Sequence, residues 1–473
     1  MEMEANQPQS RHIRTVLVAN RGEIAVRIIR AAHELGMRAV AVVSDADRDS
    51  LAARLADETV HIGPAHAVKS YLNPAAILAA AQQCGADAIH PGYGFLSENA
   101  NFAAQVEAAG LAFVGPSSEV ISMMGDKARA RETAQRASVP TVPGSDGVVA
   151  SLEEARAVAS QIGYPLMIKA AAGGGGRGIR VAHSAEQLET ELPLAQREAQ
   201  AAFGDGGVYL ERFIAHARHI EVQVLGDGKH AVHLFERECS LQRRRQKVLE
   251  EAPSPSLTPA QREALCESAV RLAREVGYRS AGTLEYLFDD TRGEFYFIEM
   301  NTRIQVEHPV TEAITGIDLV RETLRIANGE PLRFTQKDIV LRGAAIECRI
   351  NAEDPSQGFR PSPGKVEALH WPGGPGVRVD SMLYGGYVVP PYYDSLLGKL
   401  IVWDENRAAA FSRLRRALRE LCIEGVKTTI SLHKGLAADD KVLAGQFHTN
   451  WLESWVQAWC EQNASAAGEV KTT

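Results

Sequence analysis

Apolar runs and helical patterns alternate along the first part of the chain. Thr15–Ala19 is a short apolar run rich in β-branched residues, and a helical pattern over Glu23–Leu35 follows it and stops at Gly36. Arg38–Val43 is a second strand candidate. Because strands that alternate with helices form parallel sheets covered on both faces, the pattern predicts a doubly wound parallel sheet up to about residue 125.

The pattern changes twice farther along the chain. Pro165–Ala170 and Gly178–Ala182 have the composition of two strands, joined by a glycine-rich connection. From about Arg342 onward the chain is rich in Gly and Pro, as in PSPGKV, WPGGPGV and YVVPPYYDS, which is typical of short strands and turns. Helical patterns follow at Arg407–Leu421 and Trp451–Cys460. We therefore expect an α/β part followed by an α+β part.

A strand predicted at 294–301 leads into a run in which every second residue is polar. The polar positions are Glu299, Asn301, Arg303, Gln305 and Glu307. In an extended chain these side chains would share one face. Carboxylate and amide oxygens suit a hard cation, a guanidinium suits an anion, and a carboxylate can take a proton. The alternative is a half-exposed strand with a solvated face. Such faces favour Lys, Thr and Glu, so we expect an anion site with a metal nearby.

Composition and charge narrow the class of protein. The chain has 473 residues, of which 45% are hydrophobic and 23% charged, and this length predicts about three domains. A net charge of −8 argues against bulk nucleic-acid binding. No apolar run approaches the roughly 18 residues that span a membrane, and the polar, acidic start lacks a secretory signal. The 6 cysteines form no CxxC pair, which is typical of reduced thiols. We expect a cytoplasmic globular protein, with an enzyme as the favoured class.

A run of glycines at Gly173–Gly176 is the first candidate for phosphate binding. Backbone N–H groups without side chains can wrap phosphate oxygens, although a plain flexible loop is the alternative. Phosphate binding is favoured because the run joins two predicted strands, and because Lys169 on the preceding strand would need an anionic partner if buried. Neither a P-loop nor a G-x-G-x-x-G fingerprint is present, so a nicotinamide or flavin role is poorly supported.

Two further residues are candidates for a nucleotide and its metal. Lys127 would begin a helix, where the macrodipole disfavours a cation, so a bound anion explains it better than an ordinary surface position does. Glu285 is a carboxylate in an otherwise apolar strand pattern, and an edge-strand acid is the alternative. Together with Glu299 and Asn301 it would complete an oxygen-rich cage suited to Mg²⁺ or Mn²⁺.

Two polar clusters each allow more than one role. The run QRRRQK at 242–247 is either a solvated basic surface or a source of one or two cations for the anion site. His219 and Glu221 would share a strand face, where a histidine is more often structural than functional.

A series of segments in this order resembles the biotin carboxylase branch of the ATP-grasp superfamily over roughly residues 14–460. The segments are ANRGEIAVRII, HPGYGFLSEN, MGDK, KAAAGGGGRGIRV, ECSLQRRRQKVLEEAP, GTLEYLF, FIEMNTRIQVEHPVTE, ECRINAEDP and PPYYDSLLGKL. Any one of them could arise by chance, but the collinear set is specific. The resemblance implies a doubly wound N-terminal domain, an ATP-grasp core with a mobile glycine-rich lid, and a C-terminal barrel-sandwich domain.

The domain boundaries that the resemblance implies cover the whole chain. They are a polar extension at 1–13, the N-terminal domain at 14–125, the ATP-grasp domain at 126–334 with its lid at about 142–214, the C-terminal domain at 335–460, and a flexible tail at 461–473.

The resemblance also implies a reaction. Bicarbonate would attack the γ-phosphate of ATP to give carboxyphosphate, and the released carbon dioxide would be captured by the ureido nitrogen of biotin. Glu307 would take the proton of bicarbonate, and the phosphate set free would deprotonate biotin. Arg349 would stabilise the negative charge on the ureido oxygen. The chain past Asn301 is then better interpreted as an extended active-site loop than as a strand.

Carried onto this chain, the resemblance assigns a residue set to each ligand. The ATP set is Lys127, Lys169, Gly175, Gly176, Glu211, Arg212, Phe213, Ile214, His219, Gln242, Glu285 and Glu299. The metal set is Glu285, Glu299 and Asn301. The bicarbonate set is Lys247, Arg303, Gln305 and the backbone of Val306, and the biotin set is Tyr93 and Arg349. The catalytic set is Arg303, Glu307, Lys247 and Arg349.

The chain departs from similar proteins at two positions. Arg245 stands where they usually carry His near the nucleotide, and Pro375 stands where an aromatic residue often makes a dimer contact. The other contacts of that kind, Arg30, Glu34 and Arg378, are present, so we expect a homodimer.

The resemblance also implies partners, because the chain contains no Met-Lys-Met biotin-attachment motif. Biotin would arrive on a separate biotin carboxyl carrier protein, and a carboxyltransferase subunit would use it, within an acetyl-CoA or acyl-CoA carboxylase of fatty acid synthesis. Two alternatives stay open: an ATP-grasp ligase that acts on another nitrogen, such as that of urea, and a catalytically silent subunit. The complete set of Lys169, Glu285, Glu299, Asn301, Arg303 and Glu307 argues against the silent subunit.

Overall fold

The computed structural model describes residues 12–171 and 179–469 and divides the chain into two compact units. Unit 1 comprises Met1–Val139, Arg218–Tyr286 and Glu299–Thr473, and unit 2 comprises Pro140–Ala217 and Leu287–Ile298. Each unit has its own hydrophobic core and is described separately. Among the helices of the described residues, none is both long and apolar enough to cross a membrane.

The N-terminal part of unit 1 is a five-stranded parallel sheet in the order β3-β2-β1-β4-β5. Its strands are β1 (Thr15–Val18), β2 (Arg38–Ser44), β3 (Glu58–Gly63), β4 (Ala88–His90) and β5 (Ala112–Phe113). Successive strand residues point to opposite faces, so Val16 packs in the core beside α1 (Gly22–Glu34), while Leu17 packs with α3 (Pro74–Cys84) and α4 (Ala100–Ala108). The predicted doubly wound parallel sheet is confirmed.

Short helices continue this part of the chain. They are α2 (Leu51–Leu55), α5 (Ser118–Gly125) and α6 (Lys127–Arg136). The side chain of Asp126 caps α6 by accepting hydrogen bonds from the amides of Ala128 and Arg129, which fixes Lys127 at the first helical position.

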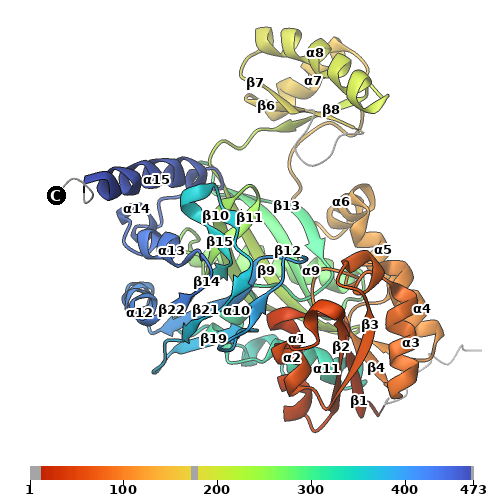
Figure 1. The fold of residues 1–473 in the computed structure, drawn as a ribbon. Coiled ribbons are helices and arrows are strands. Elements are labelled where there is room, and N and C mark those ends of the chain that lie inside the picture. Colours follow the sequence, from red (N-terminus) through yellow and green to blue (C-terminus); the bar gives the residue numbers. More distant parts are fainter. Residues whose placement is uncertain (1–11, 172–178, 470–473) are drawn as a thin grey trace, which may run out of the picture. The chain divides into compact units, whose positions relative to one another are not determined.

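The largest sheet of the described residues has eight strands, in the order β13-β12-β9-β10-β11-β14-β21-β19 (Figure 1). Its strands are β9 (Ala217–Asp227), β10 (Ala231–Arg243), β11 (Gln246–Ala252), β12 (Arg279–Asp289), β13 (Glu294–Asn301), β14 (Ala344–Asn351), β19 (Val377–Ser381) and β21 (Leu396–Asp404). Strand β11 pairs antiparallel with β14, so the middle and the last parts of the chain share one sheet. Charged side chains from both parts therefore lie side by side.

Three helices accompany the sheet: α9 (Pro259–Glu275), α10 (His308–Thr315) and α11 (Leu319–Ala327). Thr258 and Gln261 form a capping box at the start of α9. Helix α10 packs on the face of the sheet that carries Ala345 and Ile401, through Val310 and Ile314.

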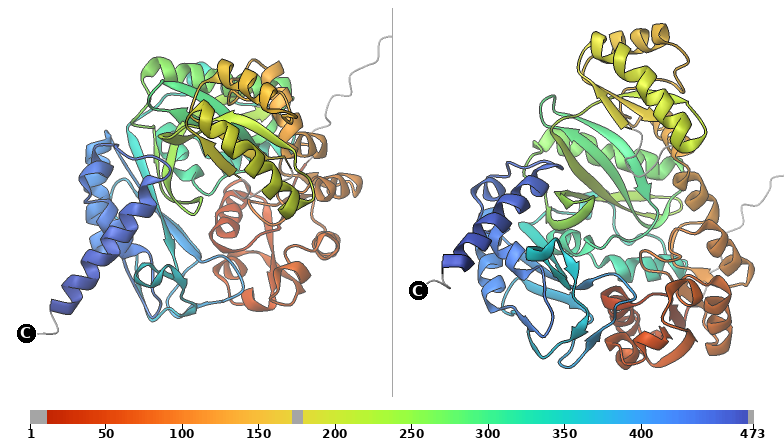
Figure 2. Two further views of the ribbon diagram at one scale, coloured as in Figure 1. Left: turned by 90° about the horizontal axis from the view of Figure 1, so that it is seen from above. Right: turned by 45° about the horizontal axis from the view of Figure 1, so that its top comes forward.

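The rest of unit 1 consists of helices and short strand pairs around one core. The helices are α12 (Arg407–Glu420), α13 (Ile430–Leu436), α14 (Asp440–Leu443) and α15 (Trp451–Glu469), and the blue C-terminal segments lie together in both views of Figure 2. The strand pairs are β15 (Glu353–Asp354) with β16 (Arg360–Pro361), β17 (Gly364–Lys365) with β20 (Val388–Val389), and β18 (Ala368–His370) with β22 (Cys422–Glu424). The short strands predicted from the Gly- and Pro-rich composition are confirmed.

Helix α15 is longer than the sequence pattern indicated. It continues to Glu469, past both the predicted helix end at Cys460 and the start of the segment expected as a flexible tail. The predicted helix end at Cys460 was wrong, because the alanines at 464, 466 and 467 have a high helix propensity despite the small, polar composition of this segment. The tail expected at 461–473 stays a prediction.

Unit 2 is a three-stranded antiparallel sheet covered by two helices (Figure 1). Its elements are β6 (Leu166–Ala170), β7 (Ile179–Ala182), β8 (Val208–Arg212), α7 (Leu152–Ile162) and α8 (Ala185–Phe203). Apolar side chains from all five form its core. The two strands predicted around the glycine run are confirmed, while the run itself lies outside the described residues.

Candidate active site

The carboxylate of Glu307 lies at the start of α10, fully buried between two cations. Lys247 on β11 donates to its Oε1 over 2.6 Å, and Arg349 on β14 donates to its Oε2 over 2.9 Å. Burial and the neighbouring Glu221 raise the pKa of Glu307, but Lys247 and Arg349 outweigh them and hold the pKa below its usual value. Glu307 is therefore a charged carboxylate, able to accept a proton.

Lys247 is surrounded by acidic groups. Its Nζ donates to Glu221 over 2.5 Å and to Glu285 over 3.2 Å, besides its bond to Glu307. Burial lowers the pKa of Lys247, but these carboxylates raise it well above the ordinary value, so the side chain stays charged. Arg349 and Arg237 also pair with two of these carboxylates, Glu307 and Glu221, so the charges of the cluster largely compensate one another.

Arg349 links Glu307 to a second buried carboxylate. Its Nε donates to Glu250 over 2.5 Å. Burial raises the pKa of Glu250 to about 7, although Arg349 opposes the shift. The antiparallel register of β11 and β14, with Glu250 opposite Glu347, explains why side chains from these two strands meet here.

Glu285, in the middle of β12, lies beside Glu299 and Asn301 at the end of β13. The Nδ2 of Asn301 donates to Oε1 of Glu285 over 2.9 Å. Burial and then Glu285 raise the pKa of Glu299, while Lys127 lowers it, so these groups act on one another. A divalent cation would relieve the repulsion between the two carboxylates, and the oxygen donors suit Mg²⁺ or Mn²⁺. The residues therefore fit the predicted metal, although the amide oxygen of Asn301 here accepts from Arg303.

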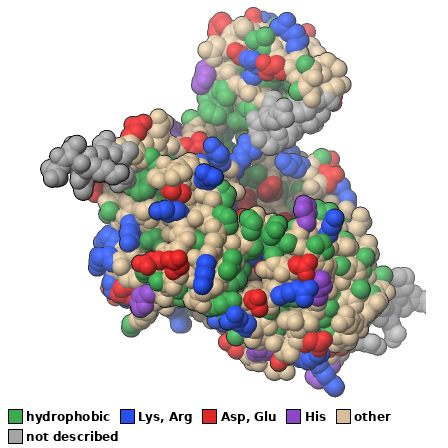
Figure 3. Space-filling view, viewed as in Figure 1, with side chains coloured by type: hydrophobic (Ala, Val, Ile, Leu, Met, Phe, Trp, Pro, Cys, Tyr) green, Lys and Arg blue, Asp and Glu red, His purple; other side chains and the backbone are tan. Residues whose placement is uncertain are grey.

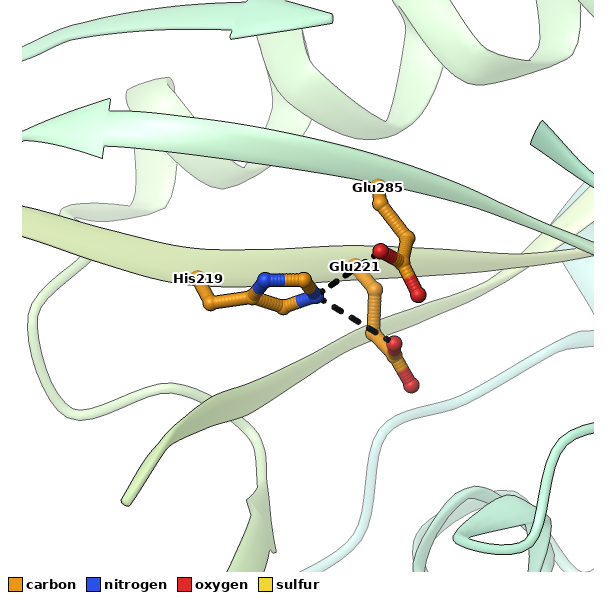
Figure 4. A group of neighbouring side chains, drawn as sticks. All are labelled: His219, Glu221 and Glu285. Atoms are coloured by element: carbon orange, nitrogen blue, oxygen red, sulfur yellow. Dashed lines mark ion pairs between the residues drawn. The ribbon is translucent and has the colours of Figure 1, made fainter. Parts of the chain in front are cut away.

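His219 lies between two carboxylates (Figure 4). Its Nε2 is 3.3 Å from Glu285 Oε2 and 3.8 Å from Glu221 Oε2, and potential ligand atoms of these three residues lie within 4.8 Å of one another. Burial lowers the pKa of His219, but Glu285 raises it, to a net value of about 9. A protonated imidazole cannot ligate a metal, so His219 is a counter-ion to the acidic cluster in this arrangement.

The chain between β13 and α10 is irregular, as the sequence indicated for the segment past Asn301. Arg303 Nη1 lies 3.2 Å from Gln305 Oε1, and Gln305 donates to Glu285 over 3.1 Å. The carbonyl of Val306 accepts a hydrogen bond from Lys399 over 2.8 Å. Guanidinium, amide and carboxylate groups thus converge, as an anion site next to a metal requires.

Tyr93 lies in the loop after β4, and its hydroxyl donates to Glu23 over 2.5 Å. Burial and Glu23 raise the pKa of the hydroxyl well above its ordinary value, while Arg349 acts in the opposite direction. The two residues assigned to biotin therefore lie within electrostatic range of each other.

Unit 2 holds a second group of the nucleotide candidates. Lys169 on β6 forms an ion pair with Glu211 on the neighbouring strand β8, which supplies the anionic partner that the sequence required. Arg212 donates to the hydroxyl of Tyr296 over 2.7 Å, and Phe213 donates its amide to Pro165. Ile214 is buried in a small apolar cluster. Gly175 and Gly176 lie outside the described residues.

Gln242 lies near the end of β10, and Arg245 lies in the turn between β10 and β11. Gln242 is nearly buried and donates to the carbonyl of Cys239 over 2.8 Å. Arg244 and Arg245 have φ values of 49° and 66°, so the turn places two exposed arginines in the left-handed region. The amide of Arg244 donates to Glu453 on α15 over 3.1 Å.

Several residues that shape the site were missed by sequence reasoning. Glu98 accepts from Arg303 Nε over 2.9 Å and from the amide of Thr302 over 3.0 Å. Arg237 is fully buried and donates to Glu221 over 2.6 Å. Glu98 belongs to the quoted segment HPGYGFLSEN, so a signal existed for it. For Arg237, only the fold shows that its strand faces the acidic cluster.

The surface and the cysteines agree with the composition. On the face drawn in Figure 3, basic and acidic side chains are interspersed rather than gathered in one broad basic patch. All 6 cysteines belong to the described residues and are free.

Family models match nearly the whole chain. They are the biotin carboxylase N-terminal domain at residues 12–121, the ATP-binding domain of the carbamoyl-phosphate synthase L chain at 126–335, and the biotin carboxylase C-terminal domain at 347–454.

Individual relatives agree with these models. A biotin carboxylase of Pseudomonas aeruginosa is 56% identical over 440 residues, which cover 93% of this chain and 97% of that protein. The biotin carboxylase domain dimer of Hydrogenobacter thermophilus 2-oxoglutarate carboxylase, solved with MgADP and bicarbonate, is 51% identical with a TM-score of 0.82, covering 93% of this chain and 97% of that one. The biotin carboxylase subunit of a pyruvate carboxylase is 52% identical with a TM-score of 0.87, covering 94% and 98%.

Proposed function

The chain belongs to the biotin carboxylase family, and from that premise we propose that it catalyses the ATP-dependent carboxylation of biotin with bicarbonate. One observation carries the proposal more than any other. A buried, charged Glu307 is held by Lys247 and Arg349, near the carboxylate and amide groups that would hold a metal and near a loop with a guanidinium. This combination suits a reaction that removes a proton from a small anion beside a nucleotide–metal complex.

The reaction balances in three steps. Bicarbonate attacks the γ-phosphorus of ATP. Carboxyphosphate is formed, and ADP is the leaving group. Carboxyphosphate then divides into carbon dioxide and phosphate, and the ureido nitrogen of biotin loses its proton to that phosphate and attacks carbon dioxide. The products are carboxybiotin, ADP and phosphate.

The residues of this chain bind the anion and move its proton. Arg303 and Lys247 would hold bicarbonate, with Gln305 and the backbone of Val306 completing the contacts. Glu307 would accept the bicarbonate proton at one of its two carboxylate oxygens, each of which accepts a hydrogen bond from Lys247 or Arg349 in this structure. Arg349 would then stabilise the charge that develops on the ureido oxygen, because it is fixed in place by Glu250. Tyr93 would line the biotin side.

Glu285, Glu299 and Asn301 would hold Mg²⁺ or Mn²⁺, which supplies neutralisation of the phosphoryl charge. Lys127, Lys169, Gly175 and Gly176 would bind phosphates, and the adenine pocket would be formed by Glu211, Arg212, Phe213 and Ile214. The compactness of Pro140–Ala217 supports its assignment as the lid domain of an ATP-grasp core. The remaining boundaries at 1–13, 14–125, 126–334, 335–460 and 461–473 stand as proposals of the same kind.

The partners belong to the same proposal. Biotin would be presented by a biotin carboxyl carrier protein and used by a carboxyltransferase subunit, in a cytoplasmic acetyl-CoA or acyl-CoA carboxylase. A homodimer is supported by a surface hollow lined by Arg30, Glu34 and Arg378, and by the solved dimer of a relative. Sedimentation of the purified chain at several concentrations tests the dimer. The biotinylated protein that co-purifies with the chain identifies the carrier.

Release of ADP in bicarbonate and Mg²⁺, with and without free biotin, tests the function. We expect biotin to stimulate ADP release and to become carboxylated in the same reaction. Stimulation by urea but not by biotin would assign the chain to a ligase for another nitrogen. Nucleotide binding without turnover in any mixture would mean that the chain is a silent subunit.

A further inference from the structure

A buried lysine that is absent from the catalytic set reaches the loop that carries Arg303 and Glu307. Lys399 on β21 is 0% exposed. Its Nζ donates to the carbonyl of Val306 over 2.8 Å and lies 3.0 Å from Oε1 of Glu23. The C-terminal part of the chain thus contacts the centre of the proposed bicarbonate site.

The charge on Lys399 needs an explanation beyond packing. An ammonium taken out of water is costly, and an apolar side chain of similar length would fill the same space without that cost. Burial lowers the pKa of Lys399, but Glu23, Glu347 and Asp380 raise it above its ordinary value. The lysine is therefore charged, with Glu23 as its ion-pair partner.

The hydrogen bond of Lys399 holds the peptide that joins Val306 to Glu307. Glu307 is the N-cap residue of α10, and in the described structure its side chain makes no capping hydrogen bond. Its carboxylate is instead engaged by Lys247 and Arg349. The orientation of this first helical turn therefore depends on contacts from outside the helix, and Lys399 supplies one of them.

Glu23 connects Lys399 to Tyr93, the residue proposed to line the biotin side. It lies in the first turn of α1, fully buried, and its Oε1 also accepts the hydroxyl hydrogen bond of Tyr93 over 2.5 Å. Its other oxygen has no hydrogen-bond partner among the described residues. One carboxylate oxygen thus joins Lys399 to the loop that carries Tyr93.

We propose that Lys399 and Glu23 form a positioning pair, which fixes the loop that carries Arg303 and Glu307 relative to Tyr93. The role in substrate binding rests on the proposed function. Neither residue touches the reacting atoms: Lys399 acts through the Val306–Glu307 peptide, and Glu23 acts through Tyr93. Disturbing the pair should weaken the binding of bicarbonate and biotin and leave that of ATP unchanged.

The test must separate positioning from folding. Lys399→Met alone leaves Glu23 buried without its cation, and this variant is expected to lose stability. The double variant Lys399→Met/Glu23→Gln removes both charges and retains an amide that can accept from Tyr93. We expect it to melt near the wild-type temperature, while KM for bicarbonate and for free biotin rises at least tenfold and KM for ATP changes less than twofold.

A matched control removes another buried ion pair from the same part of the chain. Arg21 donates to Asp47 over 2.8 Å, and both side chains are less than a tenth exposed. Arg21→Met/Asp47→Asn should leave the KM for bicarbonate within twofold of the wild-type value. An equal rise in both double variants would overturn the proposal, as would a Lys399→Met/Glu23→Gln protein with wild-type KM values.

Hydrogen exchange keeps the proposal testable if the chain does not carboxylate biotin. Amides of the segment 302–310 should exchange faster in Lys399→Met/Glu23→Gln than in the wild type or in the Arg21 control. Unchanged exchange there would mean that the pair does not position the loop. Faster exchange in an enzyme that ignores biotin would instead refute the proposed function alone.

Discussion

The Nη2 atom of Arg349 lies 2.9 Å from Oε2 of Glu307, which joins the proposed oxyanion stabiliser to the proposed base. The Nζ atom of Lys247 lies 2.6 Å from the other oxygen of the same carboxylate, Oε1. Uptake of a proton by Glu307 removes the charge that both cations neutralise. Arg349 then becomes more available for negative charge on a substrate. In the proposed mechanism, proton removal from bicarbonate would therefore prepare the site for the charged form of biotin.

Glu307→Ala should abolish bicarbonate-dependent turnover and leave ATP binding nearly intact. Lys247 keeps Glu221 and Glu285 as partners and Arg349 keeps Glu250, so neither cation is left without a carboxylate when Glu307 is removed. Loss of a general base lowers the rate by about 10²–10⁴-fold. Titration calorimetry with ATP and an assay of ADP release measure the two effects. A parallel loss of ATP affinity would show that Glu307 is mainly structural.

Glu299→Gln should raise the Mg²⁺ concentration required for half-maximal activity by about tenfold or more. The change removes a charged oxygen ligand beside Glu285 and keeps the shape of the side chain. Activity measured over a Mg²⁺ series at saturating ATP gives the shift. Glu263→Gln, at an exposed position of α9, is the control and should follow the wild-type curve. An unchanged requirement in Glu299→Gln would exclude Glu299 from the metal set.

Arg245→His should be tolerated, with kcat/KM for ATP within about threefold of the wild type. Arg245 is exposed and has a φ of 66°, a region in which histidine is enriched among non-glycine residues. Steady-state kinetics with varied ATP test this expectation. A complete loss of activity would mean that the arginine has acquired a specific role at the nucleotide.

The sequence predicted those parts of the fold and the site that depend on local pattern. The alternation from Glu299 to Glu307 indicated a metal site and an anion site, because residue types and spacing carry that chemistry. The alternation of polar and apolar residues does not identify Glu98, Glu250 or Lys399, although Glu98 belongs to a segment of the family resemblance. Each of them meets the site through a different strand or loop, so only the folded sheet shows what they contact.

Two further features, the end of α15 and the partner of Lys169, show what the sequence could not predict. The end of α15 was misplaced because a polar, small-residue segment resembles a tail, although its alanines favour helix. The partner of Lys169 was expected to be an anion, and Glu211 supplies one from a strand distant in the sequence. The need for a partner is visible in a sequence, but its identity depends on strand register.

Acid should destabilise the folded protein in part through His433 on α13. Its Nε2 lies 2.7 Å from the carbonyl of Arg349 and so donates to it, while its buried Nδ1 has no hydrogen-bond partner in the described part of the chain. Burial lowers the pKa of His433 from 6.5 to about 4. Between these values the unfolded chain binds more protons than the folded one, so stability is complete above pH 6.5 and falls as the pH drops toward 4.

The contribution lost by pH 5 is about 2 kcal/mol, from 1.36 kcal/mol per unit of pKa. Urea unfolding at pH 7.5 and pH 5 should therefore show a smaller pH dependence for His433→Asn than for the wild type. His66→Asn changes an exposed histidine and should retain the wild-type dependence. Equal dependence in His433→Asn and the wild type would contradict a neutral, buried His433.

Gly435→Ala should destabilise the protein, although alanine has a higher helix propensity than glycine. Trp451, Trp455 and Trp459 stack along one face of α15, with ring centroids 5.8 Å apart in each successive pair. A Cβ at Gly435 on α13 would lie 2.6 Å from Nε1 of Trp459 and 3.0 Å from Cη2 of Trp455. Alanine favours a helix by about 1 kcal/mol over glycine, but overpacking costs about 1–3 kcal/mol.

The stacked rings cannot move aside independently, so we expect the overlap to outweigh the propensity and to lower the free energy of unfolding by about 1 kcal/mol. Chemical denaturation measures the change. Gly125→Ala, at the end of α5 where a Cβ meets nothing within 4 Å, is the matched control and should be neutral or stabilising. In a Trp459→Leu background the cost of Gly435→Ala should shrink, because the clashing ring is gone. A cost that persists there would place its cause in the backbone of α13 rather than in the tryptophan stack.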